Sequence, residues 1–347
     1  MPASCDLARN GRDLTRARFL RLALAALALV LATPASAATP PLRPEIEIFI
    51  TEVAAKHGLA EAPLRKLLRQ AQVRPSIIRA MSAPGTARPW FEYRRRIVEP
   101  VRIENGARFW AENAAALERA RREFGIPEEL IVATIGVETL YGRHTGSFKV
   151  IDALTTLAFD YPPRAAFFRG ELEEFLLLAR EAGLDAASIR GSYAGAIGVP
   201  QFLPSSYRKY AVDFDGDGRR DLAGSVADAI GSVANYYRSF GWQTGAPVVV
   251  PADPREAELG AVLTAGIKPH TKVGELRAKG VVPQEPLDDN AEATVFYVQA
   301  EDGPKLMLGL NNFYVITRYN RSTNYAMSVW ELATEVRARH SAGSSAR

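Results

Sequence analysis

The spacing of apolar residues along the chain predicts mainly helical structure. Apolar side chains recur every three or four residues, which places them on one face of a helix. Gly, Pro or polar residues close each segment, as expected at helix ends. The predicted helices span residues 45–58, 61–72, 74–82, 104–125, 127–142, 164–183 and 325–339.

The pattern changes after residue 243. Short apolar runs at 246–251, 292–300 and 305–310 are separated by Pro, Gly and Asp, which is typical of strands. The predicted fold class is therefore mainly α (α+β), with a small β-rich insert at residues 244–310.

These patterns also predict how the chain is divided. A Pro-rich linker at residues 38–44 precedes an N-terminal helical domain at 45–125 and a core at 126–243. After the insert, residues 311–339 return to the helical part. Residues 340–347, HSAGSSAR, are predicted to be a disordered tail because they are small, polar and terminal.

Residues 1–37 have the features of a secretory signal peptide. Five arginines precede the apolar run Leu22–Ala32, and Ala35–Ala37 fits an A-x-A cleavage signal. The run is shorter than the roughly 20 residues that a membrane-spanning helix needs, although an uncleaved anchor remains the alternative. We therefore expect a periplasmic protein that does not require the membrane once the leader is removed.

Charge and cysteine usage support this interpretation. The chain has 43 basic and 39 acidic residues, of which the leader holds five arginines and two aspartates. The remaining 38 basic and 37 acidic residues give a net charge of +1, so charge does not indicate a nucleic-acid partner. Cys5, the only cysteine, precedes the apolar run and is not a lipidation site. A mature chain without cysteine suits an oxidising compartment.

Glu138 is the one carboxylate in the apolar run Ile131–Arg143. Ile131, Thr134 and Ile135 share its helix face at the 3.6-residue period. Burial and the negative end of the helix dipole both favour the neutral carboxyl, as a general acid requires. The alternative is a structural Glu that is paired with Arg143 or hydrogen-bonded within the core.

The segment Gly191–Tyr207 is rich in small residues. Its three glycines permit a close approach of backbone to a ligand. Gln201 can make directed amide contacts, and Phe202 or Tyr207 can stack on a sugar face. A tightly packed junction without any ligand is the alternative.

Several long motifs together resemble the lytic murein transglycosylase B family. They are IGVETLYGR from Ile135, LAFDYPPRAAFFRGELEEFLLLAR from Leu157, GSYAGAIGVPQFLPSSYRKYAVDFDGDGRRDL from Gly191, DAIGSVANYYRSFGW from Asp228 and NFYVITRYNRSTNYAMSVWEL from Asn312. The resemblance runs from about residue 45 to residue 336, in the family's order. It implies a goose-type-lysozyme-like core that binds the glycan strands of peptidoglycan and uses no organic cofactor.

The resemblance also implies a reaction. The family cleaves the β-1,4 bond between N-acetylmuramic acid and N-acetylglucosamine and leaves a 1,6-anhydromuramic acid end. Glu138 matches the family's catalytic acid, which then acts as base toward the C6 hydroxyl. The substrate's N-acetyl group is expected to stabilise the cationic intermediate. No second acid flanks the cleft motifs as a paired-carboxylate glycosidase would need; Asp152 and Asp160 are the nearest downstream.

The resemblance assigns substrate contacts as well. Ser192 and Gln201 match the family's substrate-contacting Ser and Gln, and four residues match cleft-lining positions: Tyr236, Tyr319, Asn320 and Tyr325. One departure stands out. The family often has Gly-Tyr-Gly-Gln where this chain has Gly198-Val199-Pro200-Gln201, so one stacking contact is missing.

An acidic loop at 213–221 predicts a structural Ca²⁺ site. Carboxylates at positions 1, 3, 5 and 9 and Gly218 at position 6 fit a calcium-binding loop. Position 12 is Gly224 instead of Glu, so the standard pattern is broken. The predicted ligands are Asp213, Asp215, Asp217, the backbone of Arg219, Asp221 and Asp228. A solvated acidic turn is the alternative.

Four functions follow from these patterns. The first is a periplasmic lytic transglycosylase, and the second is a hydrolase of the same glycan with water as the nucleophile. The third is a non-catalytic protein that binds peptidoglycan. A calcium-sensing module is the weakest, because one imperfect loop has no second loop to pair with.

Overall fold

The computed structural model describes residues 41–83, 88–255 and 259–345. The predicted signal peptide and residues 38–40 of the linker lie outside these ranges. From Glu45 onward the chain forms one compact unit. Within the described ranges, no helix is long and apolar enough to cross a membrane.

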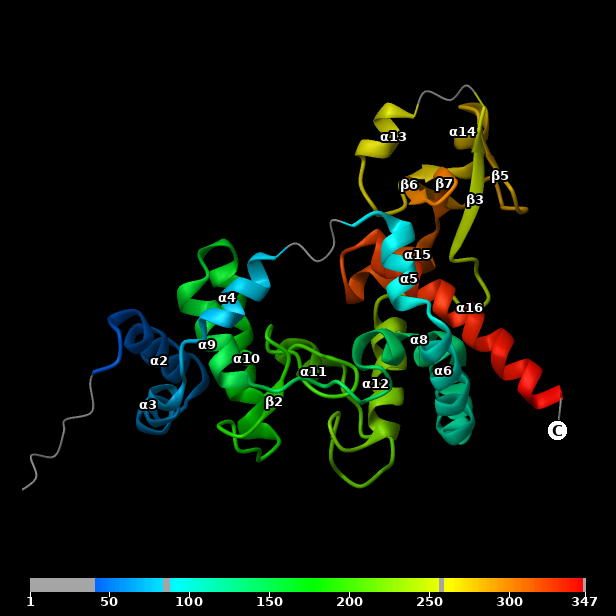
Figure 1. Ribbon diagram of the computed structural model, residues 1–347. Helices are drawn as coiled ribbons and strands as arrows, with labels where there is room; N and C mark the ends of the chain where they lie inside the picture. Colours follow the sequence, from blue (N-terminus) through cyan, green and yellow to red (C-terminus); the bar gives the residue numbers. More distant parts are fainter. Residues whose placement is uncertain (1–40, 84–87, 256–258, 346–347) are drawn as a thin grey trace, which may run out of the picture. The chain divides into compact units, whose positions relative to one another are not determined.

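The N-terminal part of this unit is entirely helical (Figure 1). Pro44 opens its first helix, and Glu45 and Glu47 stand in the first turn, where the helix dipole favours acidic side chains. The helices are α2 (Pro44–His57), α3 (Glu61–Gln70), α4 (Pro75–Ser82), α5 (Trp90–Ile97), α6 (Pro100–Glu112) and α7 (Ala114–Phe124).

The single helix predicted at 104–125 is wrong: the structure has two helices, α6 and α7, that meet at Asn113. The Asn113 side chain donates to the backbone oxygen of Phe109 at 2.8 Å and so competes with the helical hydrogen-bond ladder. Its backbone ψ of 22° ends α6 and starts α7 in a new direction. Gly125, with a φ of 71°, ends α7.

The core follows and is also mainly helical. α8 is buried by α6, α7, α12 and α16, and α10 packs on α9 and α11. The elements are α8 (Glu128–Thr139), β1 (Phe148–Lys149), α9 (Val150–Asp160), η1 (Pro162–Arg164), α10 (Ala165–Glu181), β2 (Arg190–Gly191), α11 (Pro204–Tyr210) and α12 (Val226–Ser239). β1 and β2 form a two-stranded antiparallel sheet.

The strands after residue 248 form an antiparallel five-stranded sheet in the order β4-β6-β7-β3-β5 (Figure 1). This segment buries its own apolar cluster, which includes Val250, Val295 and Leu308. Its elements are β3 (Val249–Pro254), α13 (Gly260–Thr264), β4 (Thr271–Lys272), α14 (Val273–Ala278), β5 (Val281–Pro283), β6 (Glu292–Ala300) and β7 (Gly303–Gly309).

Two helices close the chain: α15 (Asn311–Tyr319) and α16 (Thr323–Ser345). The prediction of a disordered tail from residue 340 is wrong for the residues described, because α16 continues to Ser345. Tertiary contacts explain the extra turns. The ring of His340 stacks on Trp110 at 4.5 Å, and Arg339 donates to Glu104 at 2.7 Å.

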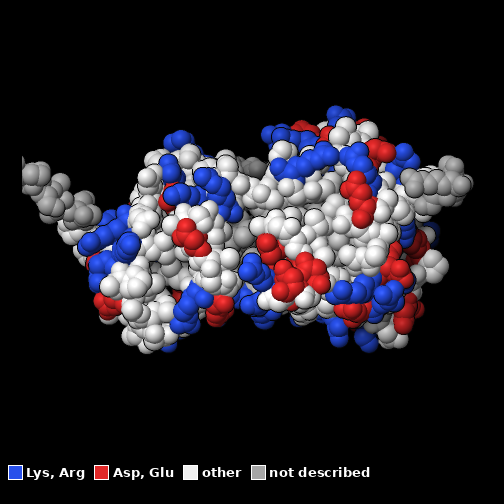
Figure 2. Space-filling view, turned by 90° about the horizontal axis from the view of Figure 1, so that it is seen from below, with Lys and Arg blue, Asp and Glu red and all other residues white. Residues whose placement is uncertain are grey.

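Charge on one face of the molecule has no dominant sign. Figure 2 shows basic and acidic side chains interspersed over the face that it presents. This face agrees with the near-neutral charge balance of the chain after residue 37.

Candidate active site

Glu138 lies in the last turn of α8, a helix that is otherwise buried. Residues Leu130–Gly136 and Thr139 are inaccessible or nearly so, whereas Glu138 is only half-buried. The helix ends at Thr139, earlier than the predicted end near Gly142, because Leu140 and Tyr141 adopt left-handed backbone angles. α8 therefore delivers one carboxyl group to the edge of an apolar core.

The surroundings of Glu138 favour its neutral form. Burial raises the pKa of this carboxyl from 4.5 to about 7, and a hydrogen bond from the Tyr325 hydroxyl, 2.6 Å from Oε1, opposes the rise in part. Arg143, the predicted structural partner, instead donates to Asn105 at 3.4 Å. Glu138 therefore keeps its proton to a much higher pH than an ordinary carboxyl group does.

Tyrosines from four helices surround this carboxyl. They are Tyr93 of α5, Tyr236 and Tyr237 of α12, Tyr319 of α15 and Tyr325 of α16. Burial raises the pKa of each, and the charge of Glu138 raises it further, so all five stay neutral near pH 7. Glu138 is the member of this group that titrates in the physiological range.

A cavity of about 680 Å³ borders this cluster. It contains four of the predicted substrate residues: Gln201, Tyr236, Tyr319 and Asn320. Glu138 and Tyr325 are not among its lining residues, and Tyr319 lies between them and the cavity, with its ring stacked on Tyr325 at a centroid distance of 6.4 Å. The remaining lining residues are Arg164, Phe167, Glu171, Phe202, Leu203, Ser205, Ser206, Phe240, Arg318 and Arg321.

Hydrogen bonds to the protein limit what the predicted contact residues can offer a ligand. Gln201 donates both amide hydrogens, to Thr145 O at 3.0 Å and Gly198 O at 2.9 Å, so only its carbonyl oxygen remains for a ligand. Tyr319 donates to Pro200 O at 2.5 Å and Tyr236 to Arg318 O at 2.6 Å. The Tyr319 ring, rather than its hydroxyl hydrogen, remains for substrate, whereas Tyr236 is buried and packs against Tyr319.

Two positions in the Gly-rich segment, Ser192 and Val199, differ from the roles that the family resemblance implied for them. Ser192 is not among the residues that line the cavity; its Oγ accepts from the amides of Ala194 and Ala196 and closes its own loop. Val199, which replaces the family's frequent Tyr, is 5% exposed. That position faces the interior of this protein, so the replacement removes no surface for stacking.

The sequence analysis missed a second acid in the cavity wall. Glu171 lines the cavity, but its two oxygens accept from the Ser205 amide at 3.0 Å and the Ser205 hydroxyl at 2.7 Å. Phe168 and Phe175 lie three residues before and four residues after Glu171, so the sequence itself places this acid on an apolar helix face. Asp152, considered earlier, is instead buried and paired with Arg74 at 3.0 Å.

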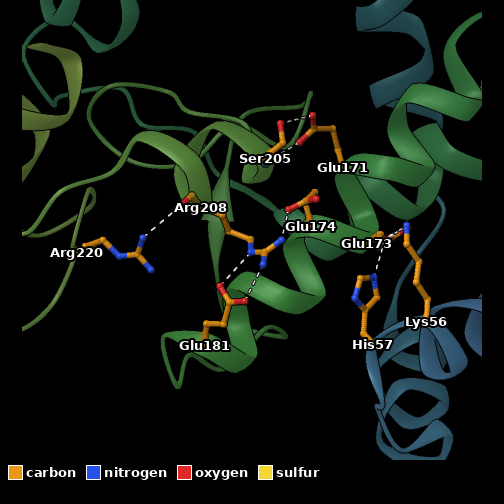
Figure 3. A network of polar contacts seen from close by, with 9 residues as sticks. All are labelled: Lys56, His57, Glu171, Glu173, Glu174, Glu181, Ser205, Arg208 and Arg220. Atoms are coloured by element: carbon orange, nitrogen blue, oxygen red, sulfur yellow. Dashed lines mark hydrogen bonds and ion pairs between the residues drawn. The ribbon is translucent and has the colours of Figure 1, made fainter. Parts of the chain in front are cut away.

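Further acids of α10 anchor the cavity wall to its neighbours (Figure 3). Arg208 of α11 bonds Glu174 and also Glu181, the latter at 2.7 Å. On the other side, Glu173 accepts from Lys56 at 2.8 Å and contacts His57 at 2.6 Å, both from α2. α10 thus fixes α11, which contributes Ser205 and Ser206 to the cavity.

The acidic loop gathers part of the predicted ligand set. Asp213, Asp215 and Asp217 each offer one oxygen within 4.8 Å of the others, and all three are exposed. Gly216 and Gly218 make the tight turn, with φ values of 81° and 88°. Three hard carboxylate oxygens at this spacing fit Ca²⁺.

The structure places the other two acids of the predicted set differently. Asp221 accepts from the Ala223 and Gly224 amides. Asp228 is fully buried, and its oxygens accept from the amides of Phe214, Asp215 and Asp221. Asp228 therefore braces the loop from beneath.

Comparison with known proteins agrees with this geometry. Residues 42–334 match the Transglycosylase SLT domain family. The chain is 43% identical over 303 residues to membrane-bound lytic murein transglycosylase B of Escherichia coli K12, covering 84% of this chain and 82% of that protein.

Solved structures share the fold. Lytic transglycosylase SltB1 of Pseudomonas aeruginosa superposes with a TM-score of 0.83 at 47% identity, covering 86% of this chain and 99% of that one. Slt35 of E. coli, solved in complex with calcium, gives 0.78 at 43%, covering 86% and 94%. SltB3 of P. aeruginosa, solved in complex with NAG-anhNAM-pentapeptide, gives 0.74 at 31%, covering 84% and 78%. The chain therefore belongs to the SLT-domain family of lytic murein transglycosylases.

Proposed function

We propose that this enzyme cleaves the β-1,4 bond between N-acetylmuramic acid and N-acetylglucosamine in peptidoglycan, and that it leaves a 1,6-anhydromuramic acid end. The observation that carries the proposal is the half-buried Glu138 carboxyl, which has a pKa of about 7 and accepts a hydrogen bond from Tyr325. It belongs to an aromatic cluster, and two tyrosines of that cluster, Tyr236 and Tyr319, line the cavity. The complex of SltB3 with NAG-anhNAM-pentapeptide supports the anhydro end.

In this mechanism Glu138 serves twice. Its proton passes to the bridging oxygen as the C1–O4 bond breaks, and the N-acetylglucosamine chain leaves as an alcohol. The resulting carboxylate then takes the proton of the muramic C6 hydroxyl as O6 bonds to C1. A pKa near the working pH suits both transfers, because neither protonation state is rare. No water is consumed.

The cavity supplies orientation. The rings of Tyr319 and Phe167 offer apolar faces for sugar rings, and the buried Phe202 packs behind Tyr319. Gln201 and Asn320 offer polar atoms for the hydroxyl and acetamido groups. Glu171 has both oxygens engaged by Ser205, so we assign it a structural role rather than that of a second catalytic carboxylate.

Product mass separates this proposal from its two alternatives. We expect purified sacculi treated with the enzyme to release muropeptides that are lighter by one water than those released by a hydrolase, as measured by mass spectrometry. Products of hydrolysed mass would instead make water the nucleophile. Binding to sacculi without release of any muropeptide would make the protein a non-catalytic binder.

We also propose that Ca²⁺ binds Asp213, Asp215 and Asp217 and stabilises the loop. The supporting observations are the converging carboxylates and the calcium complex of Slt35. The ion would offset the mutual repulsion of three negative charges.

Calcium should therefore raise the thermal midpoint by several degrees over an EDTA-treated sample, through preferential binding to the folded state. The rise should be smaller with an equal concentration of Mg²⁺, which prefers smaller, octahedral sites. Asp215→Asn should remove most of the calcium effect, whereas Asp302→Asn, in the exposed β6–β7 turn, should keep it. An equal calcium response in both variants would contradict the assignment.

We place this activity in the periplasm. The predicted leader and the absence of cysteine after Cys5 support export, and the proposed substrate is a cell-wall polymer.

A further inference from the structure

The backbone just after Glu138 is strained. In the described ranges, three residues other than glycine have positive φ: Leu140 at 51°, Tyr141 at 61° and Gln201 at 52°. Two of them are consecutive, and Gly142 extends the left-handed run at 83°. Bulky L-residues avoid this region, so surrounding contacts must hold them there.

The strained turn folds Tyr141 back onto its own helix. The Leu140 amide donates to Gly136 O at 3.1 Å and the Tyr141 amide to Ile135 O at 3.4 Å. A Cβ added at Gly136 would lie 2.5 Å from the Tyr141 hydroxyl oxygen and 2.6 Å from Cζ. The ring therefore lies directly against the backbone of α8, where only glycine leaves room.

Two other helices enclose the same ring. A Cβ at Gly106 of α6 would lie 2.5 Å from the Tyr141 hydroxyl oxygen and 2.6 Å from Val336 of α16. The Phe109 ring of α6 lies 5.4 Å away, and the Tyr141 hydroxyl donates to Arg102 O at 2.9 Å. Tyr141 is thus a wedge where α6, α8 and α16 meet.

These helices hold both ends of the Glu138 hydrogen bond. α8 carries Glu138 and α16 carries its donor, Tyr325. The same end of α8 is tied to the cavity segment, because Thr139 Oγ1 donates to Val199 O at 2.8 Å and accepts from the Gly142 amide at 3.0 Å. A shift of this helix end would move the acid away from both its donor and the cavity.

We propose that Tyr141 is a positioning residue for the reaction. Its ring, held by the strained turn and seated against two glycines, fixes the end of α8 against α16. The Glu138 carboxyl then stays within reach of the Tyr325 hydroxyl and shielded from bulk water. The inference rests on the proposed function, in which Glu138 is the acid.

The test compares kcat, KM and pH profile on purified sacculi. In the wild type, kcat should fall above a midpoint near pH 7, because only protonated Glu138 can act as acid. In Tyr141→Ala, kcat should fall about 10- to 100-fold with KM changed less than about threefold, since a misplacement near 1 Å has costs of this size. The midpoint should move down toward 4.5 as water reaches the carboxyl.

The midpoint of the kcat–pH profile reports the protonation of Glu138, because the neighbouring groups do not titrate near pH 7. The groups that face it are the five tyrosines named above, each with a raised pKa, and the always-charged Arg102 near Tyr93 and Tyr141. Gly136→Ala should reproduce the kcat loss and the midpoint shift by displacing the ring, which covers the case in which Tyr141→Ala does not fold.

Two control variants separate positioning from general stability. Tyr141→Phe keeps the wedge and should retain a midpoint near 7 and kcat within about threefold. Phe49→Ala removes a buried ring from α2, where it packs edge-on against Phe159, and should lower thermal stability without moving the midpoint. A folded Tyr141→Ala or Gly136→Ala enzyme with wild-type kcat and midpoint would overturn the inference. A wild type that releases no anhydro product would instead overturn the proposed function.

Discussion

Glu138→Gln should reduce the release of anhydromuropeptides from sacculi by about 10²- to 10⁴-fold, the range that a positioned general acid contributes. The amide keeps the size of the side chain and can still accept the Tyr325 bond, but it has no proton to give the bridging oxygen. Binding to sacculi should persist, because the cavity residues are untouched. Mass spectrometry of the soluble products, together with a pelleting assay, measures both.

The folding of this variant can be checked in a way that also measures the pKa. The folded-state pKa of Glu138, about 7, lies above its ordinary 4.5, so the native protein binds more protons than the unfolded chain between these values. Wild-type stability therefore falls as pH rises from about 4.5 to 7. Gln does not titrate, so the variant should gain up to about 3 kcal/mol over the wild type between pH 4 and pH 8.

The predicted loss of activity and the predicted pH-dependent gain in stability can fail independently. Full activity in Glu138→Gln would remove the acid role. A stability difference that does not change with pH would show that the carboxyl is solvated, with an ordinary pKa. If Glu138→Gln were both inactive and unfolded at pH 8, unfolding rather than the missing proton would explain the lost activity. The activity of Glu138→Ala would then be compared with that of the wild type at pH 5.

Helical periodicity located α2, α3, α4, α8, α10 and α16, but it missed α5, α9, α11, α12 and α15. Two of its other failures have local causes. A pattern of apolar positions cannot show Asn113 turning its amide onto the backbone, which splits one predicted helix into α6 and α7. It cannot show that Trp110 and Glu104 hold the last turns of α16 either. In both cases a tertiary or side-chain contact overrides the local preference of the sequence.

The acid of the site was readable from sequence because a carboxylate on an apolar helix face is costly unless it is used. The same pattern at Glu171 was not recognised in the sequence. Only the structure shows that Ser205 supplies hydrogen bonds to both oxygens of this carboxylate. Hydrogen bonds also decide which predicted contacts remain free: Ser192 closes its own loop, whereas Gln201 keeps its carbonyl oxygen. Motif matching identifies which positions correspond to substrate contacts in the family. It cannot show which hydrogen-bond donors and acceptors at those positions remain free for a ligand.

The acidic loop illustrates the same limit. Asp228 was predicted as a ligand because it is the next carboxylate after a broken position 12 and because the resembled family has a longer loop. In the structure Asp228 is buried near the start of α12, and its own amide donates to Ser225 Oγ at 3.1 Å, so its role as a ligand stays a prediction. Its two oxygens collect three backbone amides, from both ends of the loop. The loop and the first turn of α12 are thus one hydrogen-bonded unit.

Asp228→Ala should therefore lower the free energy of unfolding by about 3–5 kcal/mol, which is the scale for removing one partner of a buried charged network. The amides of Phe214, at 2.6 Å, and Asp221, at 2.7 Å, would lose their acceptors where water has little access. Asp228→Asn should recover only part of the loss, because its amide nitrogen must face one of these donors. Urea denaturation with an unchanged slope measures the difference.

The comparison that isolates this effect is with the exposed acids of the same loop. Asp217→Asn removes one carboxylate of the exposed cluster and should change stability mainly when calcium is present, whereas Asp228→Ala should be destabilised equally in EDTA. If Asp228→Ala lost its stability only in calcium, Asp228 would be acting through the ion after all. If it lost less than about 1 kcal/mol in either condition, the three amides would be finding other acceptors, and the bracing role would be wrong.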